Sequence, residues 1–125
     1  MDGLDTRDGI DRVRGTRLHR TMQAVAAAHP FYRGVLSETG LTADDFRTIE
    51  DLQKLPLTPK QDYISDPQAF RLDADALPDD FTLEERVIWD IAYTSGTTGG
   101  KPSPFYNTTH DIYGILDQAR RCNEA

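Results

Sequence analysis

The residues best suited to chemistry lie in one glycine-rich stretch at positions 94–102, which reads Thr-Ser-Gly-Thr-Thr-Gly-Gly-Lys-Pro. Its glycines allow the backbone to turn tightly and to bring N–H groups close to a ligand. Four hydroxyl side chains add neutral donors, and one lysine adds a positive charge. All three kinds of group suit anionic oxygens. We therefore predict an anion-binding loop made by these residues: Thr94, Ser95, Gly96, Thr97, Thr98, Gly99, Gly100 and Lys101.

Two other interpretations compete with a ligand-binding loop of this kind. A glycine-rich hairpin without a ligand is the first, but such a hairpin does not need four hydroxyls among its glycines. A Walker-type phosphate loop, with the pattern G-x-x-x-x-G-K-[ST], is the second. If Lys101 is the lysine of that pattern, Ser95 stands where the first glycine belongs. Pro102 then replaces the serine or threonine that binds Mg²⁺, so the sequence disfavours the Walker pattern.

A strand on each side is expected to hold the two ends of the loop. Residues 87–94 show the alternation of a strand, and we expect Trp89 and Tyr93 to be core residues of it. Residues 104–106 can form a return strand, which makes the loop the tip of a hairpin. Thr108 predicts the start of a following helix, because an aspartate stands three residues later.

The chain before this hairpin reads as a series of helices separated by prolines. Apolar residues recur at helical spacing over residues 6–29, and this helix should end before Pro30, because the residue before a proline avoids helical geometry. A second helix should run from Pro30 to a glycine stop signal at Gly40. Three short helices should follow, each capped by a threonine: Thr42, Thr48 and Thr58.

These elements predict an α/β fold in three segments. Residues 1–70 form a helical N-terminal region, and residues 71–85 form an Asp-rich surface connector. Residues 86–125 then form the first strands of an α/β domain, with the loop between them. The sheet would be incomplete if these strands had no further neighbours, and its exposed edge would invite association.

Length and composition narrow the classes of protein. A chain of 125 residues suffices for one domain, and its net charge of −7 argues against a nucleic-acid partner. The longest apolar run, Ala24–Ala28, is far shorter than the about 20 residues of a membrane helix. The single cysteine, Cys122, fits a reducing, cytoplasmic environment. No pattern predicts a metal site or a catalytic side chain in the chain itself.

Three segments carry a resemblance to a known family. Residues 91–102, Ile-Ala-Tyr-Thr-Ser-Gly-Thr-Thr-Gly-Gly-Lys-Pro, resemble the phosphate-loop signature of the adenylate-forming, or AMP-binding, superfamily. Upstream, His-Pro-Phe-Tyr-Arg at 29–33 and Ile-Glu-Asp-Leu-Gln-Lys-Leu-Pro-Leu-Thr-Pro-Lys at 49–60 resemble the N-terminal region of phenylacetate–CoA ligase and its relatives. The resemblance extends from His29 to Gln118.

The resemblance implies an AMP-forming acid–thiol ligase. In such enzymes the loop holds the phosphates of ATP while a carboxylate attacks the α-phosphorus, with Mg²⁺ assisting, and coenzyme A then displaces AMP from the acyl-adenylate. Residues 94–99 would be the phosphate cradle, and Lys101 would match the basic residue of the motif. The loop differs from its commonest form in the branch by the additional Gly100 and by a lysine that precedes Pro102.

The family's later segments do not occur in these 125 residues. They are an adenine-binding aromatic-Gly-x-Thr-Glu segment, a ribose-binding aspartate and a C-terminal lysine. We therefore expect the chain to be an N-terminal part of a ligase that is inactive alone, since positioning carries much of the catalytic rate. The alternative is a freestanding nucleotide- or anion-binding module without catalysis. A third possibility is a helical interaction surface on residues 1–70.

Overall fold

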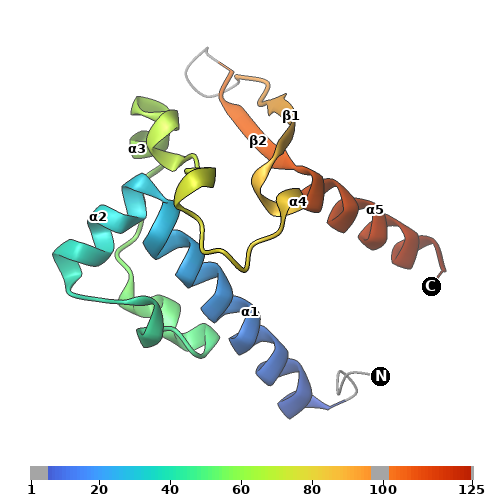
Figure 1. Ribbon diagram of the computed structural model, residues 1–125, viewed down its shortest axis with the longest axis horizontal. Coiled ribbons are helices and arrows are strands. Elements are labelled where there is room, and N and C mark those ends of the chain that lie inside the picture. Colours follow the sequence, from blue (N-terminus) through green and yellow to red (C-terminus); the bar gives the residue numbers. More distant parts are fainter. Residues whose placement is uncertain (1–5, 97–101, 125) are drawn as a thin grey trace. The chain divides into compact units, whose positions relative to one another are not determined.

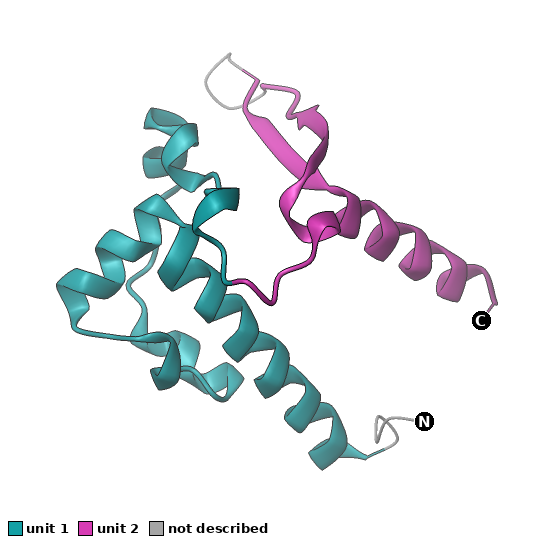
Figure 2. Ribbon diagram, viewed as in Figure 1, with its two compact units in different colours: residues 1–78 teal, residues 79–125 magenta. Residues whose placement is uncertain are grey.

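The computed structural model describes residues 6–96 and 102–124. The chain divides into two compact units, residues 1–78 and residues 79–125 (Figure 2). The boundary falls inside the Asp-rich segment 71–85. Unit 1 is helical, and unit 2 contains a two-stranded antiparallel sheet with helices (Figure 1). The structure thus confirms helices together with a small sheet.

Two helices form the main part of unit 1. Helix α1 (Arg7–Ala28) begins where the side chain of Thr6 accepts a hydrogen bond from the Gly9 N–H at 3.1 Å. It ends before His29, because Pro30 follows and opens α2 (Pro30–Thr39) at its first position. Helix α2 ends at Gly40, whose φ of 68° is the left-handed conformation that glycine adopts without steric cost. Both predicted helices are confirmed.

Short helices complete unit 1. They are η1 (Ala43–Asp45), η2 (Ile49–Lys54), α3 (Lys60–Ser65), η3 (Pro67–Phe70) and η4 (Ala74–Ala76). Thr42 and Thr48 precede η1 and η2, as predicted. The prediction that Thr58 caps the next helix is wrong by one residue, because α3 begins after Pro59. The Thr58 hydroxyl instead lies 2.8 Å from the hydroxyl of Tyr32 in α2, so a contact distant in sequence replaces the local cap.

The core of unit 1 is small and lies where α1 and α2 meet η1. Met22, Leu36 and Phe46 are buried there, and the Phe46 side chain is fully buried. Gly15 allows a close approach beside this core: a Cβ at that position would lie 2.4 Å from the carbonyl oxygen of Arg47. The backbone after Phe46 therefore packs directly on the surface of α1.

A second cluster in unit 1 is aromatic. Phe31 stacks on Phe70 with ring centroids 4.3 Å apart, and Tyr63 meets the same ring edge-on at 5.4 Å. His29 packs edge-on against Tyr32 at 4.9 Å and against Phe70 at 5.7 Å. Its Nδ1 accepts a hydrogen bond from the Tyr32 N–H at 3.3 Å, and burial lowers the pKa of His29. This cluster joins the start of α2 to α3 and η3.

Unit 2 contains the hairpin expected from the sequence. Strand β1 (Ile88–Tyr93) pairs antiparallel with β2 (Pro104–Thr108), and the register changes between Ile88 and Asp90. Helix α4 (Leu83–Arg86) precedes β1, and α5 (Thr109–Glu124) follows β2. Thr108 and Asp111 form the predicted cap of α5. The Thr108 N–H donates to the Asp111 carboxylate at 2.8 Å, and the Asp111 N–H donates to the Thr108 hydroxyl at 3.2 Å.

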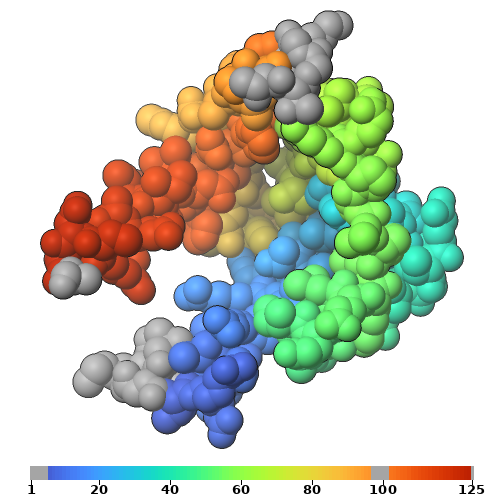
Figure 3. Space-filling model, turned by 180° about the vertical axis from the view of Figure 1, so that it is seen from behind, coloured from blue at the N-terminus to red at the C-terminus, as the bar shows by residue number. Residues whose placement is uncertain are grey.

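The described part of unit 2 has no buried residue. The prediction that Trp89 and Tyr93 are core residues is therefore wrong for this chain: their side chains are 71% and 65% exposed. A two-stranded sheet covered by no second layer leaves its apolar side chains in water. Helix α5 is likewise exposed at apolar positions, which include Ile115 and Leu116. This helix is drawn in red in Figure 3.

Candidate functional site

The β1–β2 hairpin carries the predicted anion-binding loop and brings its two ends together. The last strand pair is Tyr93 opposite Pro104. Beyond it, the N–H of Thr94 donates to the carbonyl of Ser103 at 3.0 Å. The N–H of Ser103 donates in return to the hydroxyl oxygen of Thr94 at 2.9 Å. Two reciprocal hydrogen bonds therefore join the first residue of the loop to the residue that follows Pro102.

The beginning of the loop shows the glycine geometry that the sequence predicts. Gly96 has a φ of 70°, in the left-handed region where a Cβ would be unfavourable. Thr94 and Ser95 are exposed just beyond the end of β1. The remaining predicted loop residues lie outside the described part of the chain: Thr97, Thr98, Gly99, Gly100 and Lys101.

Ser103 lies outside the predicted loop residues, although it pairs with the first of them. The sequence contained one signal for it, since Ser103 stands between Pro102 and Pro104. Prolines lack an N–H, so Ser103 is the only residue of this trio that can donate a backbone hydrogen bond. A serine in that position is easily overlooked because its side chain is not what the contact uses.

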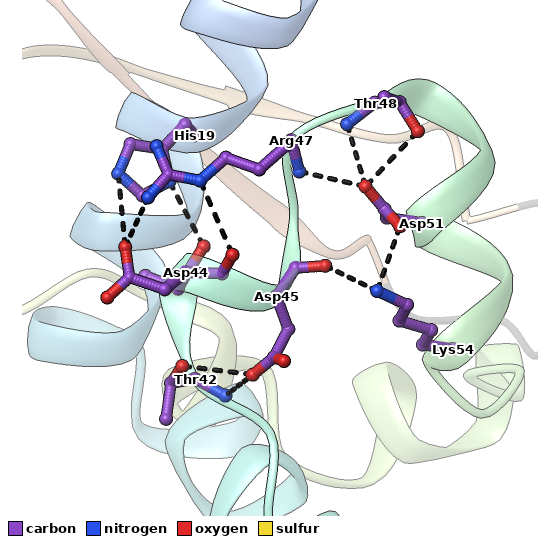
Figure 4. A network of polar contacts seen from close by, with 9 residues as sticks. His19, Thr42, Asp44, Asp45, Arg47, Thr48, Asp51 and Lys54 are labelled. Carbon is purple, nitrogen blue, oxygen red and sulfur yellow. Dashed lines mark hydrogen bonds and ion pairs between the residues drawn. The ribbon is translucent and has the colours of Figure 1, made fainter.

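A second polar cluster lies in unit 1, where η1 and η2 contact α1 (Figure 4). His19 of α1 donates from Nδ1 to the carbonyl of Ala43 at 3.1 Å, and its Nε2 lies 3.8 Å from Asp44. Arg47 donates to the same Asp44 carboxylate. These contacts attach the turn that contains η1 to α1, which makes the cluster structural.

The carboxylates of this cluster serve as helix caps. Asp51 accepts hydrogen bonds from the N–H groups of Thr48 and Arg47 at 2.7 and 2.9 Å, and Lys54 lies 2.8 Å from it. Lys54, followed by these N–H groups, lowers the pKa of Asp51 well below its usual range. Asp45 caps η1 in the same way, and the hydrogen bond that it accepts from the Thr42 N–H lowers its pKa. Both groups stay ionised at neutral pH and are poorly suited to proton transfer.

The described residues offer no other centre of this kind. Within ranges 6–96 and 102–124, no three His, Cys, Asp or Glu side chains lie close enough to hold a metal ion. None of the helices in these ranges is long and apolar enough to cross a membrane. The hairpin end therefore remains the candidate site.

The chain is similar in sequence to enzymes named as coenzyme A ligases. The particular relatives are phenylacetate–coenzyme A ligases. The protein from Escherichia coli is 32% identical over 114 residues, which cover 90% of this chain and 24% of that protein. The protein from Thermus thermophilus is 32% identical over 106 residues, which cover 85% of this chain and 22% of that protein. The protein from Pseudomonas putida is 30% identical over 115 residues, which cover 90% and 24%.

The comparisons confirm the predicted resemblance to the phenylacetate–CoA ligase branch. The similarity extends over most of this chain, so it includes both the helical unit and the hairpin. The chain spans about a quarter of the length of the curated relatives that it matches. No protein-family model matches the chain.

Proposed function

We propose that this chain supplies the N-terminal part, including the phosphate loop, of an ATP-dependent acid–thiol ligase. The observation that supports this proposal is the similarity to three phenylacetate–coenzyme A ligases over 85–90% of the chain. Its substrates would be ATP with Mg²⁺, a small carboxylic acid and coenzyme A. The carboxylate oxygen bonds to the α-phosphorus and pyrophosphate leaves. The thiol sulfur then bonds to the acyl carbon of the adenylate, and AMP and the thiol proton leave.

The loop's contribution would be electrostatic. Pyrophosphate carries away negative charge, so donors aimed at its oxygens stabilise the transition state. The N–H of Thr94 already donates to Ser103, so the backbone N–H groups of residues 95–99 and the hydroxyls of the loop would be donors of that kind, and Lys101 would balance part of the charge. The net charge of −7 does not assist, which leaves the attraction to local groups and Mg²⁺.

Unit 2 supports a role within a larger domain. Its described residues include no buried side chain, and an isolated two-stranded hairpin is marginally stable in water. Further strands and a covering layer would bury Trp89, Ile91 and Phe105, each of which is at least 45% exposed. A freestanding nucleotide-binding module would need that burial within its own 125 residues. The exposed hairpin therefore favours the ligase proposal over the freestanding module.

Two assays test the proposal. The 125-residue chain alone should show no exchange of pyrophosphate into ATP and only weak binding of Mg-ATP. A chimera in which this chain replaces the matching 114 residues of the Escherichia coli relative should form a coenzyme A thioester from phenylacetate and ATP. The control chimera carries Lys101→Ala and should lose most of this activity. A correctly folded chimera with no ATP-dependent thioester formation would refute the proposal. Exchange of pyrophosphate into ATP by the isolated chain would refute the expectation that the chain is inactive alone.

A further inference from the structure

The strand pairing ends in an unusual way at the base of the loop. Beyond the pair of Tyr93 and Pro104, a regular ladder would continue through backbone groups alone. Here one of the two bonds uses a side chain, because the Ser103 N–H donates to the hydroxyl of Thr94 at 2.9 Å. The other bond is a regular backbone bond from the Thr94 N–H to the Ser103 carbonyl at 3.0 Å.

The neighbouring prolines make this side-chain bond hard to replace. Pro102 and Pro104 have no N–H, so the Ser103 N–H is the only backbone donor on the returning side of the loop's base. Without the Thr94 hydroxyl, that donor would have to turn to the Thr94 carbonyl, as in a regular ladder, or to water.

We propose that Thr94 is a positioning residue: its hydroxyl holds the Ser103 N–H and thereby sets the separation of the two ends of the phosphate loop. This inference rests on the proposed function, and it adds to Thr94 the role of shaping the base of the loop. The hydroxyl oxygen that accepts this bond points across the hairpin to Ser103. Ser103 contributes only its backbone groups to the pair.

The first test measures the pair without any ligand, by amide hydrogen exchange of the isotope-labelled 125-residue chain. Thr94→Val keeps the shape but removes the acceptor, so exchange at the Ser103 N–H should become about fivefold faster, the factor of one neutral hydrogen bond. Thr94→Ser keeps the hydroxyl and should restore slow exchange. Ser103→Ala is the matched control, because it removes a hydroxyl but keeps both backbone groups. Unchanged exchange in Thr94→Val would overturn the proposal.

The second test adds magnesium tripolyphosphate as the probe. Thr94→Val should weaken its binding by about fivefold, and Thr94→Ser and Ser103→Ala should bind like the unmodified chain. Weaker binding by Thr94→Val with unchanged Ser103 exchange would show a direct phosphate contact and would overturn the positioning role. An unmodified chain that binds no tripolyphosphate would also overturn it. In that case the proposed ligase function would still be decided separately, by thioester formation in the chimera.

Discussion

Gly15 offers a sharp test of how α1 packs, because helix propensity and tertiary packing predict opposite outcomes for one substitution. Gly15 lies in the interior of α1, where alanine is favoured over glycine by about 1 kcal/mol. A Cβ at this position would lie 2.4 Å from the carbonyl oxygen of Arg47. We expect Gly15→Ala to destabilise unit 1 in spite of the better helix former.

The size of the effect follows from the geometry. Ordinary van der Waals contact to a Cβ begins near 3.4 Å, so the backbone at Arg47 must move away from α1 by about 1 Å. Phe46, the fully buried residue of the core, immediately precedes Arg47 in the chain and would be displaced with it. Overpacking of a tight site costs about 1–3 kcal/mol. After the gain in helix propensity of about 1 kcal/mol, the free energy of unfolding should fall by up to about 2 kcal/mol.

The matched control is Gly34→Ala. Gly34 is an exposed glycine inside α2, and a Cβ there would meet no atom within 4 Å. This variant should be more stable than the unmodified chain by up to about 1 kcal/mol. Urea unfolding followed by far-ultraviolet circular dichroism measures both variants, since unit 1 is helical. The only tryptophan, Trp89, belongs to unit 2, so its fluorescence is not a suitable probe.

A peptide of residues 6–29 separates the two contributions further. It lacks Arg47, so Gly15→Ala should raise its helix content. The reasoning would be refuted if Gly15→Ala stabilised the whole chain as much as Gly34→Ala does. That result would mean that the Arg47 carbonyl does not lie against α1.

The remaining predictions concern the core and two titrating groups. Phe46→Ala should lower the free energy of unfolding by about 3–5 kcal/mol in a urea titration, whereas Leu57→Ala, at a side chain 96% exposed, should change it by less than about 0.5 kcal/mol. Lys54 and backbone N–H groups lower the pKa of Asp51, so its carboxylate stabilises the fold above the unfolded pKa, and this contribution is lost as the pH falls through the folded pKa. Asp51→Asn should therefore be destabilising near about pH 6 and less so near about pH 2.5, which lies below the unfolded pKa, and equal losses at both pH values would contradict this. Burial lowers the pKa of His29, so the stabilising contribution of the neutral ring is complete above the unfolded value of about 6.5 and declines as the pH falls through the folded pKa. Thermal melts between about pH 5 and pH 7.5 should show this slope, and His29→Asn, which keeps a capping acceptor, should flatten it; an unchanged slope would count against the burial of His29.

The hairpin that carries the candidate site was predictable because its signals are local. The glycine at 96 adopts the left-handed conformation that a tight turn needs, and the strands on either side follow from the residues next to the loop. The role of Ser103 was not apparent, since a motif search weighs side chains and Ser103 acts through its backbone. The role of Ser103 depends on which residue lies opposite it across the hairpin.

The boundaries of α1 and α2 and the starts of η1 and η2 were determined by the sequence alone. Pro30, Gly40 and the Thr-x-x-Asp pairs act within a few residues of their own positions, so no tertiary contact is needed to predict them. The family resemblance was also present in the sequence, because it depends on short motifs.

Only the tertiary structure decided what several residues do in their final surroundings. In the sequence, Gly15 lowers the helix propensity of α1, yet in the structure it allows the Arg47 carbonyl to approach the helix. Thr58 has the residue type of a cap, yet its hydroxyl contacts Tyr32. The strand pattern predicts burial for Trp89, but burial requires a second layer, and the structure leaves that side chain exposed. In each case a contact between residues far apart in the chain, or the lack of one, outweighs the local preference.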